Sequence, residues 1–371
     1  MAAAMALKPV DRVPNAPFYE APICRYFGRT FRSALLEDQD MADCHMKAIE
    51  TFQFDWVMVG MGLIGGIIPD AMGCQVKWPE DVFPIIEMTT VFSMQDVDRV
   101  AKSDIHTKRM EAFLKGVSLL RERLNGEVPI ACEYISPFTI AARLRGTNEI
   151  MEDIYENPGL VHALQDAVVP LNIEMGRALI EAGVEYIFYG ADMECPLLIS
   201  PDHYREFVHE PTRKVVDALA EMGARVLPHM CGEIVKTGIV DMLFEMKIHG
   251  IMPGNLTQDT VLDLRELKDK CGERMCIFDQ GRDWRICRCG RNRRACWRDG
   301  RRVSGRTSGP GLWAGIHGYY SEFAERSSER AFACRSGTGP AVGWQEGAPG
   351  EARGGLAGVS RRSGTSIEEK S

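Results

Sequence analysis

Short apolar runs alternate with longer amphipathic stretches along the first 280 residues of the chain. The runs are rich in β-branched and aromatic residues and are bounded by turn-forming residues, a pattern typical of strands. We expect strands at residues 54–60, 128–133, 184–189, 225–229, 249–252 and 275–278. Because the stretches between them carry apolar residues at helical spacing, the pattern predicts a parallel α/β protein.

Start and stop signals divide the amphipathic stretches into helices. Asn or Ser followed by Pro begins two of them, and Gly ends both. The sequence therefore predicts helices between Asn157 and Gly183 and between Ser200 and Gly223, and a longer one over residues 96–124. Pro170 is expected to kink the first helix rather than end it.

The alternation of strands and helices favours a (β/α)8 barrel over an open sheet. In such barrels the chemistry takes place at the C-terminal ends of the strands. Six strands leave the barrel two short, and the missing strands should fall where the composition changes, near Gln280. The expected fold class is therefore α/β, a (β/α)8 TIM-type barrel that is incomplete at its C-terminal end and is followed by an irregular tail.

Composition divides the chain at this point. Residues 281–371 contain 16 Arg, one Lys, nine acidic residues and 17 of the 36 Gly. Their net charge is +8, which leaves −16 for residues 1–280, because the whole chain carries −8. Without apolar periodicity this segment buries too little surface to offset its ordering entropy. We expect a barrel domain over 1–280 and, over 281–371, either a disordered basic arm or an out-of-frame reading of a GC-rich gene. The second is favoured, so a nucleic-acid partner is not expected.

Several classes of protein are excluded by the same composition. No run of 18 apolar residues occurs, so a membrane partner is not expected. The N-terminus lacks the apolar core of a secretory signal. The twelve cysteines are irregularly spaced and do not resemble a disulfide framework. We therefore expect a cytoplasmic protein.

The tripeptide His229-Met230-Cys231 is the strongest candidate for chemistry. It follows a predicted strand and precedes Gly232. Imidazole and thiolate ligands suit zinc, and three protein ligands with one open position make a zinc site catalytic. A core histidine beside a buried cysteine would explain the same spacing. The position at a strand end favours the zinc interpretation.

Four further residues lie at or near predicted strands. Asp192 and Asn255 each follow a strand, Asp55 lies in one, and Tyr134 follows another. Asp55 and Asp192 are candidate catalytic residues, while Tyr134 and Asn255 are candidates for binding the cofactor or substrate. Each has a structural alternative: Asp55 would pair with an arginine or a helix N-terminus, Asp192 would form an Asx turn, and Tyr134 would lie at a pocket rim.

Several short motifs along the chain resemble one known superfamily. In chain order they are Phe54-Asp55-Trp56-Val57, Asp70-Ala71-Met72-Gly73, Ser136-Pro137-Phe138-Thr139, Gly190-Ala191-Asp192, Ile199-Ser200-Pro201 with Tyr204, His229-Met230-Cys231-Gly232 and the predicted strand at 249–252. Their order and spacing over residues 8–280 resemble the uroporphyrinogen decarboxylase superfamily, which includes zinc-dependent cobalamin:thiol methyltransferases. This resemblance implies a (β/α)8 barrel.

The methyltransferase branch of the superfamily is the more similar of its two activities, because it has a His-x-Cys zinc pair and a later third cysteine ligand. The resemblance implies that His229 and Cys231 bind Zn²⁺ and that zinc holds an acceptor thiol as thiolate. The thiolate attacks the methyl group of a methylated corrinoid on a partner protein. No segment of the tail matches the third cysteine, and Cys334 lies in a different context. A two-ligand site would hold zinc weakly.

The alternative is decarboxylation of a tetrapyrrole, the step of porphyrin biosynthesis that gives the superfamily its name. This branch uses no metal, and Asp55 matches the place of its catalytic carboxylate. Its arginine-rich N-terminal signature is matched only loosely by residues 25–29. A third possibility is a non-catalytic remnant whose tail binds anionic partners. Cys231 favours methyl transfer over both.

Overall fold

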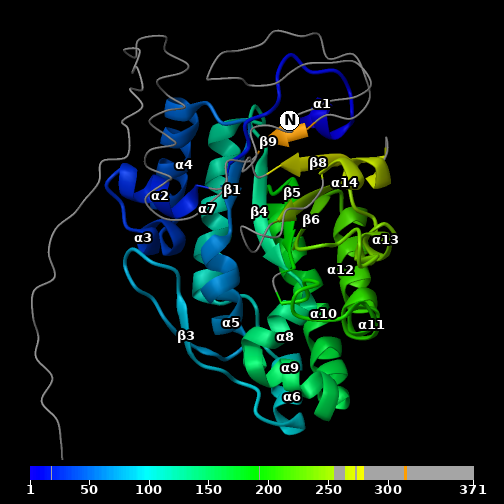
Figure 1. Cartoon of the computed structure of the whole chain (residues 1–371). Helices are drawn as coiled ribbons and strands as arrows, with labels where there is room; N and C mark the ends of the chain where they lie inside the picture. The colour runs from blue at the N-terminus through cyan, green and yellow to red at the C-terminus, as the bar shows by residue number, and fades with distance from the viewer. Residues whose placement is uncertain (18, 192, 255–263, 272–273, 280–312, 316–371) are drawn as a thin grey trace, which may run out of the picture.

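Parallel strands form the centre of the molecule, as the alternation predicts (Figure 1). The computed structural model describes residues 1–17, 19–191, 193–254, 264–271, 274–279 and 313–315. Within these residues one sheet has the order β1-β4-β5-β6-β7-β8-β9. Its strands are β1 (Val57–Val59), β4 (Ile130–Ile135), β5 (Tyr186–Gly190), β6 (Arg225–Cys231), β7 (Gly250–Gly254), β8 (Cys276–Asp279) and β9 (Trp313–Gly315). Each pair of neighbours is parallel, which is the strand order of a (β/α) barrel.

Side chains alternate between the two faces of this sheet. One cluster combines alternate strand residues with Met5 and Ala16 from the N-terminal segment, and its strand members are Met58, Ala131, Tyr186, Phe188, Leu227, Met252, Cys276 and Phe278. The residues between them belong to the larger core that faces the helices. The rings of Trp56 and Phe278 stack with centroids 5.8 Å apart, so the beginning of the sheet meets its later strands on the inner face. The inner cluster is therefore the interior of the barrel.

The described helices lie around the sheet, most of them on its outer face, whereas the first carries Met5 of the inner cluster. In chain order they are α1 (Ala2–Met5), α2 (Glu20–Tyr26), α3 (Phe31–Leu36), α4 (Asp38–Phe52), η1 (Leu63–Ile67), α5 (Ile68–Ala71), α6 (Met94–Ala101), α7 (Lys108–Leu124), α8 (Pro137–Arg145), α9 (Thr147–Glu156), α10 (Pro158–Ala182), α11 (Pro201–His203), η2 (Tyr204–His209), α12 (Glu210–Glu221), α13 (Ile239–Leu243) and α14 (Leu264–Cys271). A short antiparallel pair, β2 (Gln75–Lys77) and β3 (Ile85–Met88), follows α5. Figure 1 shows α4 and α7 on one side of the strands and α12 and α13 on the other.

The expectation of one helix over residues 96–124 is wrong, because two helices, α6 and α7, occupy this stretch. The break has a local cause. The Asp104 carboxylate accepts a hydrogen bond from the backbone N–H of His106, and the Thr107 hydroxyl caps α7 by accepting from Met110 N. α6 ends at Ala101, the Asp104 contact orders the segment that follows, and the Thr107 cap begins α7. α10, by contrast, continues through Pro170 as a single helix.

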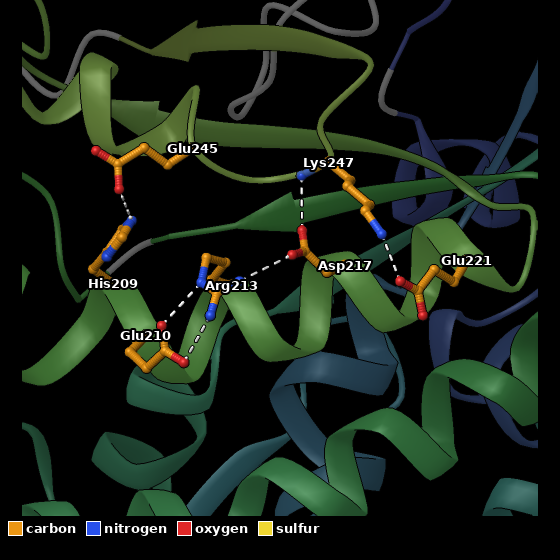
Figure 2. A network of polar contacts seen from close by, with 7 residues as sticks. All are labelled: His209, Glu210, Arg213, Asp217, Glu221, Glu245 and Lys247. Atoms are coloured by element: carbon orange, nitrogen blue, oxygen red, sulfur yellow. Dashed lines mark hydrogen bonds and ion pairs between the residues drawn. The ribbon is translucent and has the colours of Figure 1, made fainter.

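A polar network fastens α12 to the segment between α13 and β7 (Figure 2). Asp217 accepts a hydrogen bond of 2.8 Å from the backbone N–H of Lys247 and lies 3.4 Å from Arg213. A further ion pair joins Lys247 to Glu221, and His209 Nε2 lies 3.2 Å from a carboxylate oxygen of Glu245. The network holds the helix that follows β5 against the chain that leads into β7.

No helix in the part of the chain that the structure describes is both long and apolar enough to cross a membrane.

Candidate functional site

The C-terminal end of β6 carries the His-x-Cys pair. His229 lies opposite Met252, and Cys231 lies opposite Gly254, in the parallel pairing of β6 with β7. Residues two apart in a strand point to the same face, and here this is the inner face that Leu227 also occupies. Both side chains are partly exposed. The sequence therefore places an imidazole and a thiol together at the mouth of the barrel.

The two side chains meet at a distance that suits a shared metal ion. His229 Nε2 and Cys231 Sγ are 3.6 Å apart. His229 Nδ1 lies 3.1 Å from the carbonyl oxygen of Met252. Because a carbonyl only accepts, Nδ1 carries the proton and Nε2 presents its lone pair toward the sulfur. Typical Zn–N and Zn–S bond lengths at a tetrahedral angle give a nitrogen–sulfur distance of about 3.6 Å, so the pair forms one edge of a zinc tetrahedron.

Gly254 keeps this edge open. A Cβ atom at this position would lie 2.4 Å from Cys231 Sγ and 2.6 Å from His229 Cε1. Any other residue would therefore push into the space beside the two candidate ligands. The backbone of Gly254 also accepts a hydrogen bond from Gly232 N, which fixes the turn after Cys231.

The described residues supply two ligands of the expected set. Among them, no group of three His, Cys, Asp or Glu side chains lies close enough together to hold a metal ion. His229 and Cys231 fit zinc as a pair in donor type and spacing.

Glu133 is a functional candidate that the sequence analysis missed. It lies in β4 two residues after Ala131, so strand alternation directs it to the inner face. Its neighbour in the register of β5 is Phe188, whose ring lies 5.2 Å from the ring of His229. Alternation along β4 was the signal that could have found this carboxylate.

A second missed carboxylate, Glu20, lies at the C-terminal end of β1. It comes from the start of α2, is 2% exposed and accepts hydrogen bonds from Gly60 N at 3.2 Å and Met61 N at 2.7 Å. Burial raises the pKa of Glu20 to about 7, against the opposing effect of the two N–H groups. No local motif marks this residue, because its partners are 40 and 41 residues away in the sequence.

The loop after β5 is fastened to the start of α8 by buried polar groups. The Glu194 carboxylate accepts a hydrogen bond of 2.7 Å from the Thr139 hydroxyl, which also lies 3.4 Å from Met193 N. Ser136 N in turn donates to the carbonyl of Gly190. These contacts fix the chain on both sides of residue 192. Asp192 and Asn255 themselves lie outside the described residues, as do the four cysteines of the tail.

Asp55 is not brought to the mouth of the barrel. It precedes β1, at the end of the strands opposite to His229 and Cys231. Arg12 donates to both of its carboxylate oxygens, at 2.5 and 2.6 Å, and Asn15 N donates at 2.6 Å. This is the structural alternative that the sequence left open, in which Asp55 pairs with an arginine. The contacts hold the N-terminal segment against the end of the barrel at which the strands begin.

Tyr134 also lies away from the inner face. It is fully buried in β4, on the side that faces the helices. Its hydroxyl donates to the carbonyl oxygen of Asn172 in α10, and the Asn172 amide donates to the carbonyl of Ile135 at 3.1 Å. Tyr134 therefore joins β4 to α10, whereas its neighbour Glu133 takes the inward position.

The parallel strand order and the His-x-Cys pair at a strand end agree with a comparison of the sequence. A family model described as "Uroporphyrinogen decarboxylase (URO-D)" matches residues 1–280. The chain belongs to the uroporphyrinogen decarboxylase family. The resemblance stated from the sequence motifs is thereby confirmed. The matched region ends where the composition changes.

Individual relatives within this family include methyltransferases and decarboxylases. The chain is 24% identical to the methylcobamide:CoM methyltransferase MtbA of Methanosarcina mazei, over 70% of this chain and 82% of that protein. It is 23% identical to MtaA of Methanosarcina barkeri, over 73% and 78%. Identity to the uroporphyrinogen decarboxylase of Flavobacterium johnsoniae is 29%, over only 42% and 46%. The similarity to MtbA and MtaA thus extends over more of the chain than the similarity to this decarboxylase.

A solved structure supports the fold. The chain resembles a methyltransferase from Methanosarcina mazei with a TM-score of 0.62 and 19% identity, over 75% of this chain and 80% of that one. The predicted (β/α) architecture is confirmed by this similarity and by the parallel sheet.

Proposed function

We propose that this chain transfers a methyl group from a methylated corrinoid protein to a thiol acceptor, with His229 and Cys231 as ligands of a zinc ion. The observation that carries the proposal is the 3.6 Å separation of His229 Nε2 and Cys231 Sγ at the barrel mouth. The relatives named as methylcobamide:CoM methyltransferases support the reaction class. Asp192 and Asn255 remain predicted pocket residues.

Zinc in this position would hold the acceptor as a thiolate at neutral pH. The chain's own residues prepare the site for it. The Met252 carbonyl fixes the tautomer and orientation of His229, Gly254 leaves room beside the sulfur, and the Phe188 ring packs against the imidazole. These contacts hold both donor atoms in place before a ligand arrives, which lowers the cost of binding.

Decarboxylation has less support in the structure. The carboxylate proposed for it, Asp55, is held by Arg12 at the opposite end of the strands. The corresponding relative also matches less of the chain.

Metal content tests the proposal directly. Purified protein is loaded with zinc, dialysed and analysed by mass spectrometry, beside Cys231→Ser and His229→Ala variants. Cys74→Ser is the matched control, since Cys74 is a buried cysteine whose Sγ lies 3.7 Å from the Arg143 carbonyl. We expect the control to keep its zinc and both site variants to lose it.

Transfer is then measured with free methylcobalamin as donor, by the loss of its absorbance and by mass spectrometry of the thioether formed. Zinc that survives in Cys231→Ser, or transfer that is unchanged in His229→Ala, contradicts the proposal. Folded protein that binds no zinc would leave the decarboxylase and non-catalytic interpretations.

A further inference from the structure

Two consecutive leucines lie exposed beside the candidate zinc ligands. Leu197 and Leu198 belong to the loop that follows β5, and they are 50% and 51% exposed. A Cβ atom at Gly232, the residue after Cys231, would lie 3.6 Å from Leu197 Cγ. Apolar side chains scattered singly over a surface need no explanation, whereas adjoining ones are typical of a binding surface. The position of this pair at the end of β6 favours a contact with a molecule that reacts there.

The loop that carries the leucines is fixed to the framework of the site. Its first residue, Ala191, donates a backbone hydrogen bond of 3.0 Å to the carbonyl of His229. The buried Glu194 carboxylate joins the loop to the start of α8, as described above. Leu198 N donates to the carbonyl of the buried Cys195 at 2.9 Å, which closes a turn at the leucines. The backbone is therefore ordered before a ligand arrives, so little entropy is lost on binding.

The proposed methyl transfer determines what approaches this surface. The acceptor sulfur attacks the methyl carbon from the side opposite to cobalt, so that sulfur, carbon and cobalt lie in line. The sulfur–carbon bond forms as the cobalt–carbon bond breaks, the electron pair of the broken bond stays with the corrinoid, and the thiol proton goes to solvent. Reacting atoms have to approach to about 3–3.5 Å. The methyl-bearing face of the corrin ring therefore lies over the end of β6 and the loop beside it during transfer.

From this arrangement we infer that Leu197 and Leu198 pack against the methyl-bearing face of the corrin ring and position the methyl group over the candidate zinc ligands. The inference rests on the proposed function and assigns positioning residues for its donor. A corrin ring is broad and carries methyl groups at its edge, so it covers neighbouring apolar side chains that a small thiol would leave exposed. Covering two half-exposed leucines removes apolar surface from water and favours the bound donor.

Steady-state kinetics of the zinc-loaded full chain test the inference, with methylcobalamin as donor and 2-mercaptoethanesulfonate or 2-mercaptoethanol as acceptor. Leu197→Ser/Leu198→Ser should raise KM for methylcobalamin at least about tenfold, while kcat, KM for the thiol and zinc content stay unchanged. Leu197→Met/Leu198→Met should keep the wild-type KM, because methionine retains the apolar contact. Val13→Ser is the control. Val13 is 46% exposed and follows Arg12, which contacts Asp55 at the opposite end of the strands.

Equilibrium dialysis in the dark, without thiol, gives a readout that depends neither on turnover nor on zinc. The ligands are methylcobalamin and methylcobinamide, which has the same ring but lacks the nucleotide loop. A contact with the ring predicts an equal loss of affinity for both ligands in the serine double variant and none in the methionine double variant or in Val13→Ser.

Equal affinity of wild type and serine variant overturns the inference, as does a wild type that binds neither ligand. A loss confined to methylcobalamin overturns it as well, because the contact would then involve the nucleotide loop and not the ring. If no thiol is methylated, the proposed function fails, while the dialysis still decides whether the leucines bind the corrin ring.

Discussion

At the scale of single residues, the candidate site depends on a position that has no side chain. Gly254 lies beside Cys231 in the register of β6 and β7, and the space that a Cβ would take is the space between the two candidate ligands. A strand glycine at such a point marks the close approach of other groups. The donor pair is therefore set by β7 as much as by β6.

We predict that Gly254→Ala lowers zinc occupancy at least about tenfold at limiting zinc while the protein stays folded. The added methyl group would lie 2.4 Å from Cys231 Sγ and must displace it or His229. Gly159→Ala is the control, because a Cβ there meets no atom within 4 Å. Equal zinc content in Gly254→Ala and Gly159→Ala, measured by mass spectrometry, would show that the pair does not bind the metal.

Glu20 predicts a pH dependence of stability. Folding raises the pKa of this carboxyl from 4.5 to about 7, mainly through burial. Between these values the folded chain holds a proton that the unfolded chain releases, so the free energy of unfolding falls as pH rises through this interval. Over this interval the free energy of unfolding falls by about 3 kcal/mol.

Urea unfolding from pH 4.5 to 7.5 measures this effect by comparison of the wild type with Glu20→Gln. In the variant, the free energy of unfolding should not show the decrease with pH that Glu20 causes. Burial lowers the pKa of His45 to about 3, which adds a slope of opposite sign below pH 6.5 in both proteins. The comparison cancels that contribution. Parallel curves for wild type and variant would refute the assignment.

At the scale of elements, local sequence patterns predicted the strands. They did not predict the elements whose conformation depends on contacts between residues far apart in the sequence. All six strands expected from the sequence are present, because apolar, β-branched runs ended by turn residues carry their own signal. The π-helical stretches η1 and η2 were not predicted, since their hydrogen-bond pattern depends on packing. Gly66 in η1, for example, leaves room for Pro84 and Trp78 from the β2–β3 segment.

The candidate site likewise contains residues that the sequence predicted and one that it did not. His229 and Cys231 were predicted together because residues two apart in a strand share a face. Glu133 obeys the same rule but was missed, and Tyr134 was selected in its place, because the sequence alone left the phase of β4 undetermined. The structure resolves the phase through Ala131, which packs with Met58 inside the barrel. That these residues bind zinc and substrate stays a prediction.

The network on α12 gives a prediction at this scale. Asp217→Ala removes the acceptor for Lys247 N and a partner of Arg213, and should lower the free energy of unfolding by about 1 kcal/mol. Glu221→Ala is the matched control on the same helix, since its ion pair with Lys247 is exposed and should contribute nothing measurable. Urea unfolding of both variants decides this, and equal midpoints would contradict a special role for Asp217.

At the scale of the whole molecule, the family domain and the tail carry opposite charge. The match to the family covers residues 1–280, whose net charge is −16, while residues 281–371 carry +8. Within the tail the charge is concentrated, because residues 282–306 contain ten Arg and two Asp. The remaining tail residues contain seven basic and seven acidic side chains. Residues 282–306 should therefore determine whether the chain binds polyanions.

We predict that the full chain binds heparin at low ionic strength and that the affinity falls steeply with added salt, whether or not the tail has a biological partner. Ten arginines in 25 residues attract a polyanion, and each neutralised anionic group releases a counterion. A chain that lacks residues 282–306 should elute without retention, whereas one that lacks residues 307–371 should be retained like the full chain. Equal retention of the two deletions would place the interaction on the family domain. Its charge of −16 makes that outcome the less favourable one, because an acidic domain repels heparin and only a local basic patch would overcome the repulsion.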